Sequence, residues 1–248
     1  PEKGKELGVV LVHGLLASPA EVRSFGEKLK ALGYPVIGVR LKGHGTSPWD
    51  LRERSWQDWL ESVRRGYEVM SAFVRRICLV GFSTGGALVL RMAADRLEDL
   101  AGVVAISVPL RLRDRNLIFV PLVHGANQVV RWVSSFEGFM PFRQMDSEHP
   151  HINYHNVPIR CLYELKRMVD ELEERLPDVQ CPVTLIQGAD DPVVDPSGAE
   201  LIRNKLGSTQ KSLVMVPATR HGILYEDIGD THERALLFLT ALCSSSAP

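Results

Sequence analysis

Short, uninterrupted runs of apolar residues recur along the chain, and patterns typical of helices separate most of them. The runs are apolar throughout, as expected for strands of a parallel sheet that is covered on both faces. Between them, apolar residues fall at helical spacing, for example over 19–32 and after Ser55. The alternation predicts an α/β fold, with a mostly parallel sheet of about six strands and helices on both faces. The predicted strands cover residues 8–12, 35–41, 77–80, 102–107, 182–187 and 211–216.

Residues 110–178 interrupt this alternation. They contain scattered large apolar side chains and an amphipathic helix over about 159–176, but no strand pattern. A connection of this length is too long for a simple loop between sheet strands. We therefore predict an inserted helical cap, or lid, over 110–178, on an α/β core formed by 1–109 and 179–248. Its aromatic and methionine residues suit a pocket for an apolar ligand, although a helical excursion with only a packing role is the alternative.

The predicted strand 77–80 leads directly into residues 81–85, which read Gly-Phe-Ser-Thr-Gly, and then into a helical run over 87–94. A serine at the tip of so tight a turn needs small neighbours, because the strand and the helix pack closely beside it. Its hydroxyl then lies at the positive end of the helix, where negative charge is stabilised. The motif is short enough to occur by chance as a glycine-rich turn, so a base and an acid elsewhere must support it.

A serine hydroxyl needs an adjacent base to act as a nucleophile at neutral pH, and the base needs an orienting group. In a parallel α/β sheet these groups come from loops at the carboxyl ends of strands. His221 follows the last predicted strand closely and precedes the last helix. His13 and His44 also follow strands, but in glycine-flanked loops whose backbone looks more important than the ring. His232 falls in the final predicted helix and is expected to be solvated.

The loop after the predicted strand 182–187 offers three carboxylates, Asp190, Asp191 and Asp195. Any of them could instead cap a turn or the next helix. The order along the chain is therefore serine, aspartate, histidine, which is the order found on this arrangement of strand, elbow and helix.

Composition excludes several classes of partner. Hydrophobic residues make up 45% of the chain and charged residues 24%, and the formal net charge is -1, so nothing favours nucleic acid or an anionic membrane. No apolar run reaches the roughly 20 residues that span a bilayer, and the charged start of the chain is unlike a signal peptide. The 4 cysteines are widely spaced without a C-x-x-C motif, which favours reduced cysteines and a cytoplasmic location.

Three histidines of the predicted cap, His149, His151 and His155, are spaced closely enough to share a metal ion. No cysteine or H-E-x-x-H pattern accompanies them, so we interpret them as part of a polar cap surface. Neither a metal nor an organic cofactor is expected.

Several short motifs occur at the carboxyl ends of the predicted strands, and with them the chain resembles the α/β-hydrolases. Within that superfamily it is similar to the bacterial carboxylesterase and monoacylglycerol lipase family with a small helical cap. The resemblance covers nearly the whole chain. The motifs are His13-Gly14, Gly43-His44-Gly45-Thr46, the elbow at Ser83, the pattern of Gly188, Asp191 and Val194, and His221-Gly222.

The resemblance implies a catalytic triad. Ser83 would be the nucleophile, His221 the general base and then acid, and Asp191 the orienting carboxylate in preference to Asp190 and Asp195.

The resemblance also implies an oxyanion hole formed by the backbone N–H groups of Leu15 and Thr84. Relatives often carry an aromatic residue in place of Leu15 and a methionine in place of Thr84. Because the backbone donates the hydrogen bonds, these departures change only the pocket wall.

The function implied is hydrolysis of a small-molecule carboxylic ester through an acyl-serine intermediate, without stable insertion into a membrane. Short to long acyl esters, including monoacylglycerols, fit the resemblance. A thioesterase or a C–C bond hydrolase could use the same triad, and a slow-turnover ligand receptor could retain it. The oligomeric state stays open between monomer and dimer.

Overall fold

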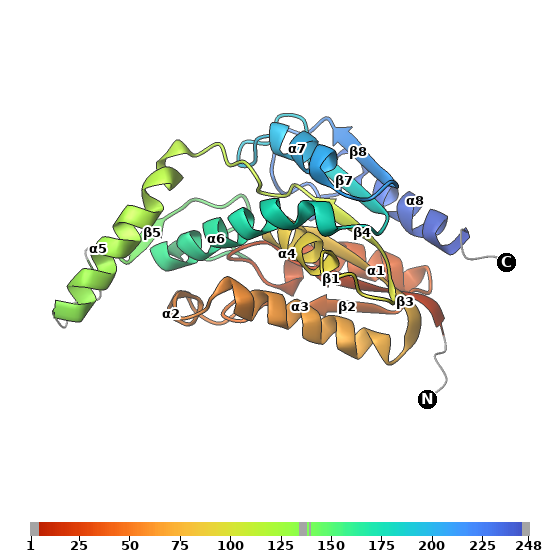
Figure 1. The fold of residues 1–248 in the computed structure, drawn as a ribbon, viewed down its shortest axis with the longest axis horizontal. Coiled ribbons are helices and arrows are strands. Elements are labelled where there is room, and N and C mark those ends of the chain that lie inside the picture. Colours follow the sequence, from red (N-terminus) through yellow and green to blue (C-terminus); the bar gives the residue numbers. More distant parts are fainter. Residues whose placement is uncertain (1–4, 134–137, 139, 245–248) are drawn as a thin grey trace.

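A six-stranded parallel sheet forms the centre of the computed structural model, which describes residues 5–133, 138 and 140–244 (Figure 1). The strand order is β2-β1-β3-β4-β7-β8, and every neighbouring pair is parallel. The prediction of a parallel α/β sheet is confirmed. The strands are β1 (Lys5–Val12), β2 (Val36–Val39), β3 (Val74–Phe82), β4 (Leu100–Ile106), β7 (Val183–Gly188) and β8 (Lys211–Val216).

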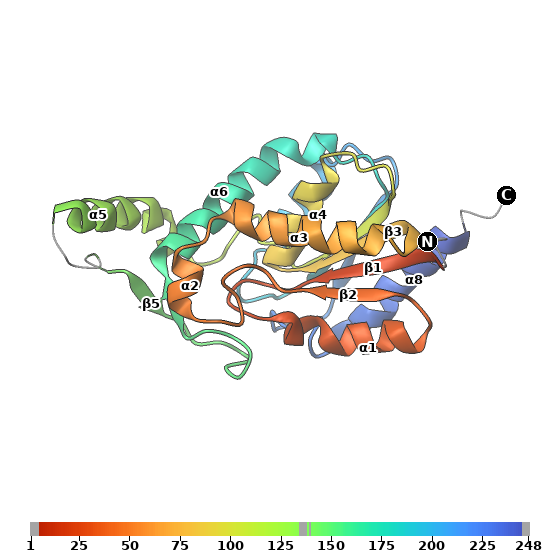
Figure 2. The ribbon, with the colours of Figure 1, turned by 90° about the horizontal axis from the view of Figure 1, so that it is seen from below.

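Helices cover both faces of this sheet, which is why its central strands bury apolar side chains on both sides. In β1, Val9 and Leu11 belong to one buried cluster, whereas Val10 and Val12 belong to another on the opposite face. Figure 2 shows α3, α4 and α6 on one side of the sheet and α1 and α8 on the other. The core helices are α1 (Arg23–Ala31), α3 (Trp56–Ser71), α4 (Thr84–Ala93), α7 (Ser197–Lys205) and α8 (Thr231–Ser244).

Local capping defines where several helices begin. The side chain of Ser55, the predicted N-cap, accepts a hydrogen bond from the N–H of Asp58, and the Asp58 carboxylate accepts one from the N–H of Ser55. The helix predicted over 19–32 is in fact two pieces. A 3-10 turn η1 (Pro19–Val22), capped by Ser18, precedes α1. Two further short helices, α2 (Pro48–Arg52) and the 3-10 turn η4 (Ile228–Asp230), follow β2 and β8 respectively.

The segment 110–178 leaves the sheet after β4 and returns before β7. Its helix α5 projects beyond the rest of the molecule at one end (Figure 1). Two strands of three residues pair antiparallel here, although the sequence showed no strand pattern. Strands this short carry too few residues to show an alternation. The elements are η2 (Arg115–Phe119), α5 (Val120–Val133), β5 (Phe142–Gln144), β6 (Asn156–Pro158), α6 (Ile159–Arg175) and η3 (Leu176–Asp178).

The helix α6 belongs to both the inserted segment and the core. Cys161, Met168 and Leu172 are buried in the same cluster as the helices α3 and α4. At its beginning, Ile159 and Leu162 belong to a smaller apolar cluster with α5 and β6. The inserted segment is thereby fixed beside the carboxyl ends of β1 and β3.

Within residues 5–133, 138 and 140–244, no helix combines the length and the apolar composition that crossing a bilayer requires.

Candidate active site

Ser83 occupies the sharp turn between β3 and α4. Its φ of 52° lies in the left-handed region that non-glycine residues rarely adopt. The flanking glycines make this turn possible. A Cβ on Gly81 would lie 2.2 Å from the carbonyl oxygen of Gly85, and one on Gly85 would lie 2.2 Å from the carbonyl oxygen of Val12. The serine side chain is thereby presented at the first turn of α4, beside the backbone N–H of Thr84.

His221 lies in the loop after β8 and links the other two predicted triad residues. Its Nε2 is 3.1 Å from the Ser83 Oγ, and its Nδ1 is 2.8 Å from Asp191 Oδ2. When Nδ1–H donates to the carboxylate, Nε2 is left to accept the serine proton. The imidazole also packs against the ring of Phe82, with the ring centroids 5.0 Å apart.

Asp191 is fully buried, and the loop after β7 surrounds its carboxylate with donors. Its Oδ1 accepts from the N–H groups of Val193 and Val194, at 2.8 and 2.9 Å. Burial by itself would raise the pKa of Asp191, but His221 and the two N–H groups outweigh it and hold this pKa below its usual value. Asp191 is therefore ionised at neutral pH.

The structure brings Asp191, and neither of the other two aspartates of this loop, to His221. Asp190 is exposed. Asp195 accepts a hydrogen bond from the N–H of Ser197 at 2.9 Å, at the start of α7.

A cavity of about 300 Å³ opens onto this triad. Ser83, His221 and the two predicted oxyanion residues, Leu15 and Thr84, all line it. One part of its wall is apolar and comes both from the inserted segment and from the loops beside the triad residues. The polar part includes Ser147 and other side chains of the loop between β5 and β6. The apolar residues include Leu16, Leu112, Leu117, Met145, Leu162 and Leu165. A larger groove of about 650 Å³ lies along β2 and α1 and contains none of the triad residues.

A family model described as "Hydrolase_4: Serine aminopeptidase, S33" matches residues 5–228. The chain belongs to the Hydrolase_4 family. Two curated relatives resemble this Hydrolase_4 chain along most of its length. A thermostable monoacylglycerol lipase of Bacillus sp. (strain H-257) is 29% identical, over 87% of this chain and 82% of the relative. A carboxylesterase of Bacillus subtilis (strain 168) is 25% identical, over 97% of this chain and 95% of the relative.

Solved structures of the same fold extend the comparison. A structure from the work on LipS and LipT, two metagenome-derived lipolytic enzymes, is 28% identical with a TM-score of 0.81 and covers 96% of this chain and 95% of its own. The monoacylglycerol lipase of Paleococcus ferrophilus superposes with a TM-score of 0.75 at 21% identity, covering 96% of this chain and 97% of its own, which shows the fold alone. The predicted α/β-hydrolase fold and the predicted family resemblance are confirmed.

The two buried histidines of the glycine-flanked loops have structural roles in this Hydrolase_4 chain. His13 Nδ1 lies 2.8 Å from the carbonyl oxygen of Gly14, and its Nε2 accepts from the N–H of Leu41 at 3.3 Å. Burial, together with the neighbouring His44, lowers the pKa of His13 to about 3, and burial lowers that of His44 to about 4. Both rings are therefore neutral. The rings matter as well as the backbone, which the sequence analysis did not anticipate.

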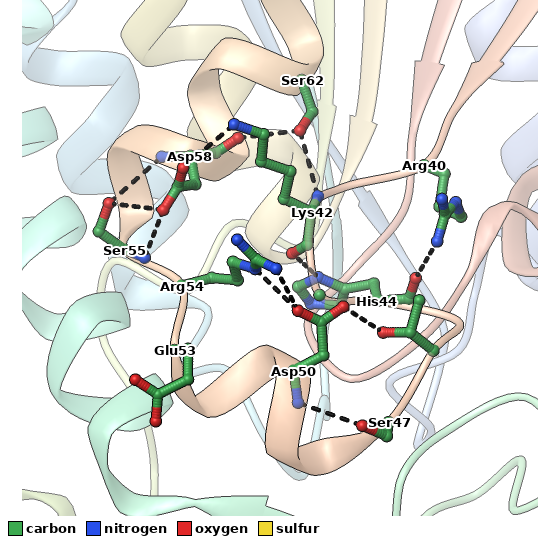
Figure 3. A network of polar contacts seen from close by, with 12 residues as sticks. Arg40, Lys42, His44, Ser47, Asp50, Glu53, Arg54, Ser55, Asp58 and Ser62 are labelled. Atoms are coloured by element: carbon green, nitrogen blue, oxygen red, sulfur yellow. Dashed lines mark hydrogen bonds and ion pairs between the residues drawn. The ribbon is translucent and has the colours of Figure 1, made fainter.

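The Gly-His-Gly-Thr loop contacts the inserted segment through Tyr154. The Tyr154 hydroxyl accepts from the N–H of Thr46 at 2.6 Å and donates to the carbonyl oxygen of Gly43 at 3.2 Å. Polar contacts hold this loop in turn. Asp50 accepts from the Thr46 hydroxyl at 2.8 Å. It also accepts from Arg54, as Figure 3 shows. Tyr154 also donates its backbone N–H to the carbonyl oxygen of Leu16, so this one residue attaches the inserted segment to the loops after β1 and β2.

Glu148 connects the inserted segment to the loop that contains His221, and no pattern in the sequence predicts this contact. Its carboxylate accepts from the backbone N–H of His221 at 3.1 Å and from that of Gly222 at 3.0 Å. A second glutamate, Glu21, is buried and lines the same cavity as the predicted oxyanion residues, and no sequence pattern predicts its position either. Nothing in a sequence distinguishes a glutamate that turns inward from the many that face solvent.

The other histidines differ from one another. His149 is buried, with its Nε2 3.3 Å from a carboxylate oxygen of Glu226, whereas His151 contacts the Tyr225 hydroxyl and His155 is exposed. In the part of the chain that the structure describes, no group of three or more His, Cys, Asp or Glu side chains could hold a metal ion.

The prediction that His232 is solvated is wrong. Only 4% of its surface is exposed, and its Nε2 bonds the carbonyl oxygen of Leu224 at 2.7 Å. It lies on the face of α8 that packs toward Phe25.

Proposed function

We propose that Ser83, His221 and Asp191 carry out the hydrolysis of carboxylic esters in this chain. The class of reaction follows from the family and from the curated relatives, one named as a monoacylglycerol lipase and one as a carboxylesterase. The observation that carries the assignment of residues is the continuous hydrogen-bonded path from the Ser83 Oγ through the His221 imidazole to the Asp191 carboxylate.

The geometry supports a two-step mechanism. His221 Nε2 takes the proton of Ser83 as Oγ attacks the ester carbonyl, and the ionised Asp191 stabilises the imidazolium that forms. His221 then gives this proton to the departing alcohol oxygen, leaving an acyl-serine. In the second step, water attacks the acyl carbon while His221 accepts its proton, and the carboxylic acid departs as the proton returns to Ser83.

The N–H groups of Leu15 and Thr84 are proposed as the donors to the oxygen that becomes negative in the tetrahedral intermediates. Both residues line the cavity at Ser83, and Thr84 is the first residue of α4, where an N–H has no acceptor within the helix. A donor in this position typically contributes about 3 kcal/mol to transition-state stabilisation.

The cavity supports a substrate with one acyl chain. Its volume of about 300 Å³ is at the small end for ligand sites, which disfavours esters with several chains. The acyl chain would lie against Leu162 and Leu165, and a polar alcohol such as glycerol would lie near Ser147 and Asn153. Medium to long monoesters, including monoacylglycerols, are therefore the proposed substrates.

We also propose that residues 110–178 act as a lid on the core formed by 1–109 and 179–248. The support is that this segment supplies Leu112, Leu117, Met145, Leu162 and Leu165 to the apolar wall of the cavity, while the proposed triad comes from the core loops. A cytoplasmic location is proposed from the cysteines. All four, which lie in the described residues, are free.

Hydrolysis of p-nitrophenyl esters from acetyl to palmitoyl, with 1-monolauroylglycerol alongside, tests this function. The wild-type protein should turn over these esters with a maximum at one chain length, and Ser83→Ala should lose several orders of magnitude in kcat. Folded wild-type protein that ignores every ester but cleaves an acyl thioester or a C–C bond would refute the ester assignment. A single burst of product without further turnover would indicate a receptor instead.

A further inference from the structure

Glu21 carries a buried carboxyl group beneath the loop that follows β1. It belongs to the short turn η1, whose neighbouring residues Ala20 and Arg23 are exposed. Only 5% of the surface of Glu21 is exposed. Its carboxyl therefore turns inward from a turn at the surface of the molecule, and it lines the same cavity as Ser83 and His221.

The carboxyl is fixed on the peptide that precedes the proposed oxyanion donor. Glu21 Oε2 accepts from the backbone N–H of Gly14 at 2.6 Å. A Cβ on Gly14 would lie 3.1 Å from this oxygen and 3.2 Å from the Ser83 Cβ. Gly14 is thus packed directly between the buried carboxyl and the serine, and the absence of a side chain allows this approach.

The next peptide is held as well. The carbonyl oxygen of Gly14 and the N–H of Leu15 belong to one peptide group, and His13 Nδ1 contacts that oxygen at 2.8 Å. Glu21 therefore fixes one peptide plane and His13 the following one, whose N–H points away from its carbonyl. Without the contact to Glu21, the Gly14 backbone would be held on one side only.

We propose that Glu21 is a positioning residue for ester hydrolysis, holding the Gly14 peptide so that the Leu15 N–H is aimed at the ester carbonyl oxygen. This inference rests on the proposed function of Ser83, His221 and the two backbone donors. Glu21 acts through the loop and does not exchange a proton with the substrate.

The charge of Glu21 adds a dependence on pH. Burial raises the pKa of its carboxyl to about 7, against the lowering effects of the Gly14 N–H and of His221. His221 faces it from the loop after β8, and Glu148 and His149 line the same cavity from the inserted segment. His13, at the end of β1, is neutral. An ionised Glu21 would oppose the developing oxyanion and would favour the protonated form of the histidine base, so its ionisation should reduce activity.

Two substitutions separate positioning from charge. In Glu21→Gln the amide oxygen still accepts from Gly14 but never ionises, whereas Glu21→Leu removes the acceptor. We expect Glu21→Leu to lower kcat by about 10- to 100-fold and to change KM by less than about 3-fold. This loss in kcat is smaller than that expected from removing an oxyanion donor altogether. An alkyl boronic acid, which forms a tetrahedral adduct on serine, should bind more weakly by a similar factor. Glu27→Leu, on the exposed side of α1, is the matched control and should be unchanged.

The pH profile gives a second readout. The kcat/KM of Glu21→Gln should equal that of the wild type within a few-fold near pH 6, and the ratio of variant to wild type should rise as the pH passes about 7. If Glu21→Leu does not fold, Glu21→Ala, which also removes the acceptor for the Gly14 N–H, replaces it in the kinetic and boronic acid measurements.

A folded Glu21→Leu protein with wild-type kcat would overturn the positioning role. A ratio that stays constant with pH would overturn the dependence on the charge of Glu21. Ser83→Ala distinguishes a failure of the proposed function from a failure of the proposed role of Glu21. If Ser83→Ala keeps its activity, the proposed function fails, but if it is inactive while Glu21→Leu is fully active, only the role of Glu21 fails.

Discussion

In the proposed mechanism, Asp191 orients the ring of His221 and stabilises its positive charge, and both effects should be measurable in the kinetics. Asp191→Asn preserves the size of the side chain but presents a neutral amide to Nδ1, which permits the wrong tautomer. We expect kcat to fall by about 10⁴-fold with a much smaller change in KM. Asp195→Asn is the control, because this carboxylate contacts the start of α7 and not His221. A large loss of kcat in Asp195→Asn but not in Asp191→Asn would assign the role of the orienting carboxylate to Asp195.

Glu21 should also make the stability of the protein depend on pH. Its pKa is raised from 4.5 to about 7 in the folded state, so the folded protein retains a proton that the unfolded chain releases between these values. This contribution to the free energy of unfolding is complete below pH 4.5 and is lost as the pH rises toward 7, by on the order of 3 kcal/mol. Urea unfolding of the wild type and Glu21→Gln across this range should show the difference, and parallel curves would contradict it.

The sequence predicted some of these residues and not others, for a physical reason. Ser83, Asp191 and His221 stand at the carboxyl ends of strands in a fixed order, and an α/β sheet brings such positions together. Glu21 and Glu148 occupy no such position. His232 was assigned to solvent because a polar residue in a terminal helix usually faces water, whereas here the carbonyl oxygen of Leu224 satisfies its ring.

At the level of elements, the strand, elbow and helix around Ser83 depend on glycine. Gly85→Ala would place a Cβ 2.2 Å from the backbone oxygen of Val12, and neither backbone can move without disturbing the sheet. We expect a loss of several kcal/mol in the free energy of unfolding, or no folded protein. Gly125→Ala, in α5, meets nothing within 4 Å and should be neutral or stabilise by up to about 1 kcal/mol. Equal effects in thermal unfolding would contradict this reading of the elbow.

The contact of Glu148 with the histidine loop predicts that the inserted segment influences catalysis. Glu148→Ala leaves the N–H groups of His221 and Gly222 without their acceptor and should lower kcat by about 10-fold through a looser histidine loop. Steady-state kinetics with one p-nitrophenyl ester measures this. Glu174→Ala, on the exposed side of α6, is the control and should have the wild-type kcat. A Glu148→Ala protein with the wild-type kcat would show that the histidine loop keeps its conformation without this contact.

Element boundaries were less predictable than element types. Every core strand of the sheet was expected from its apolar run, but β3 extends to Val74–Phe82 where the run covers only 77–80. The strand begins at the buried Val74, but the polar Arg75 and Arg76 that follow are exposed and half-buried, so the apolar run starts only at Ile77. The pair β5 and β6 had no signal, since each strand contributes three residues and depends on pairing with the other.

At the scale of the whole molecule, the sheet and the inserted segment contribute different parts of the candidate site. The three proposed triad residues lie at the ends of sheet strands. The inserted segment supplies part of the apolar wall of the cavity and reaches the loops after β1, β2 and β8 through Tyr154 and Glu148. The sequence predicts that such a segment exists, because residues 110–178 lack the alternation of strand and helix patterns found in the core. It could not predict which residues attach the segment, since those contacts join positions about 70 to 140 residues apart, a separation that local patterns do not record.

Trapping the acyl-enzyme tests the central claim most directly. After rapid acid quenching of the wild type with p-nitrophenyl butyrate, intact mass measurement should show one added butyryl group, and peptide mapping should place it on Ser83. Ser83→Ala should gain no mass and release no p-nitrophenol above background. Sustained turnover by folded Ser83→Ala, or a butyryl group mapped to another residue during wild-type turnover, would contradict the account.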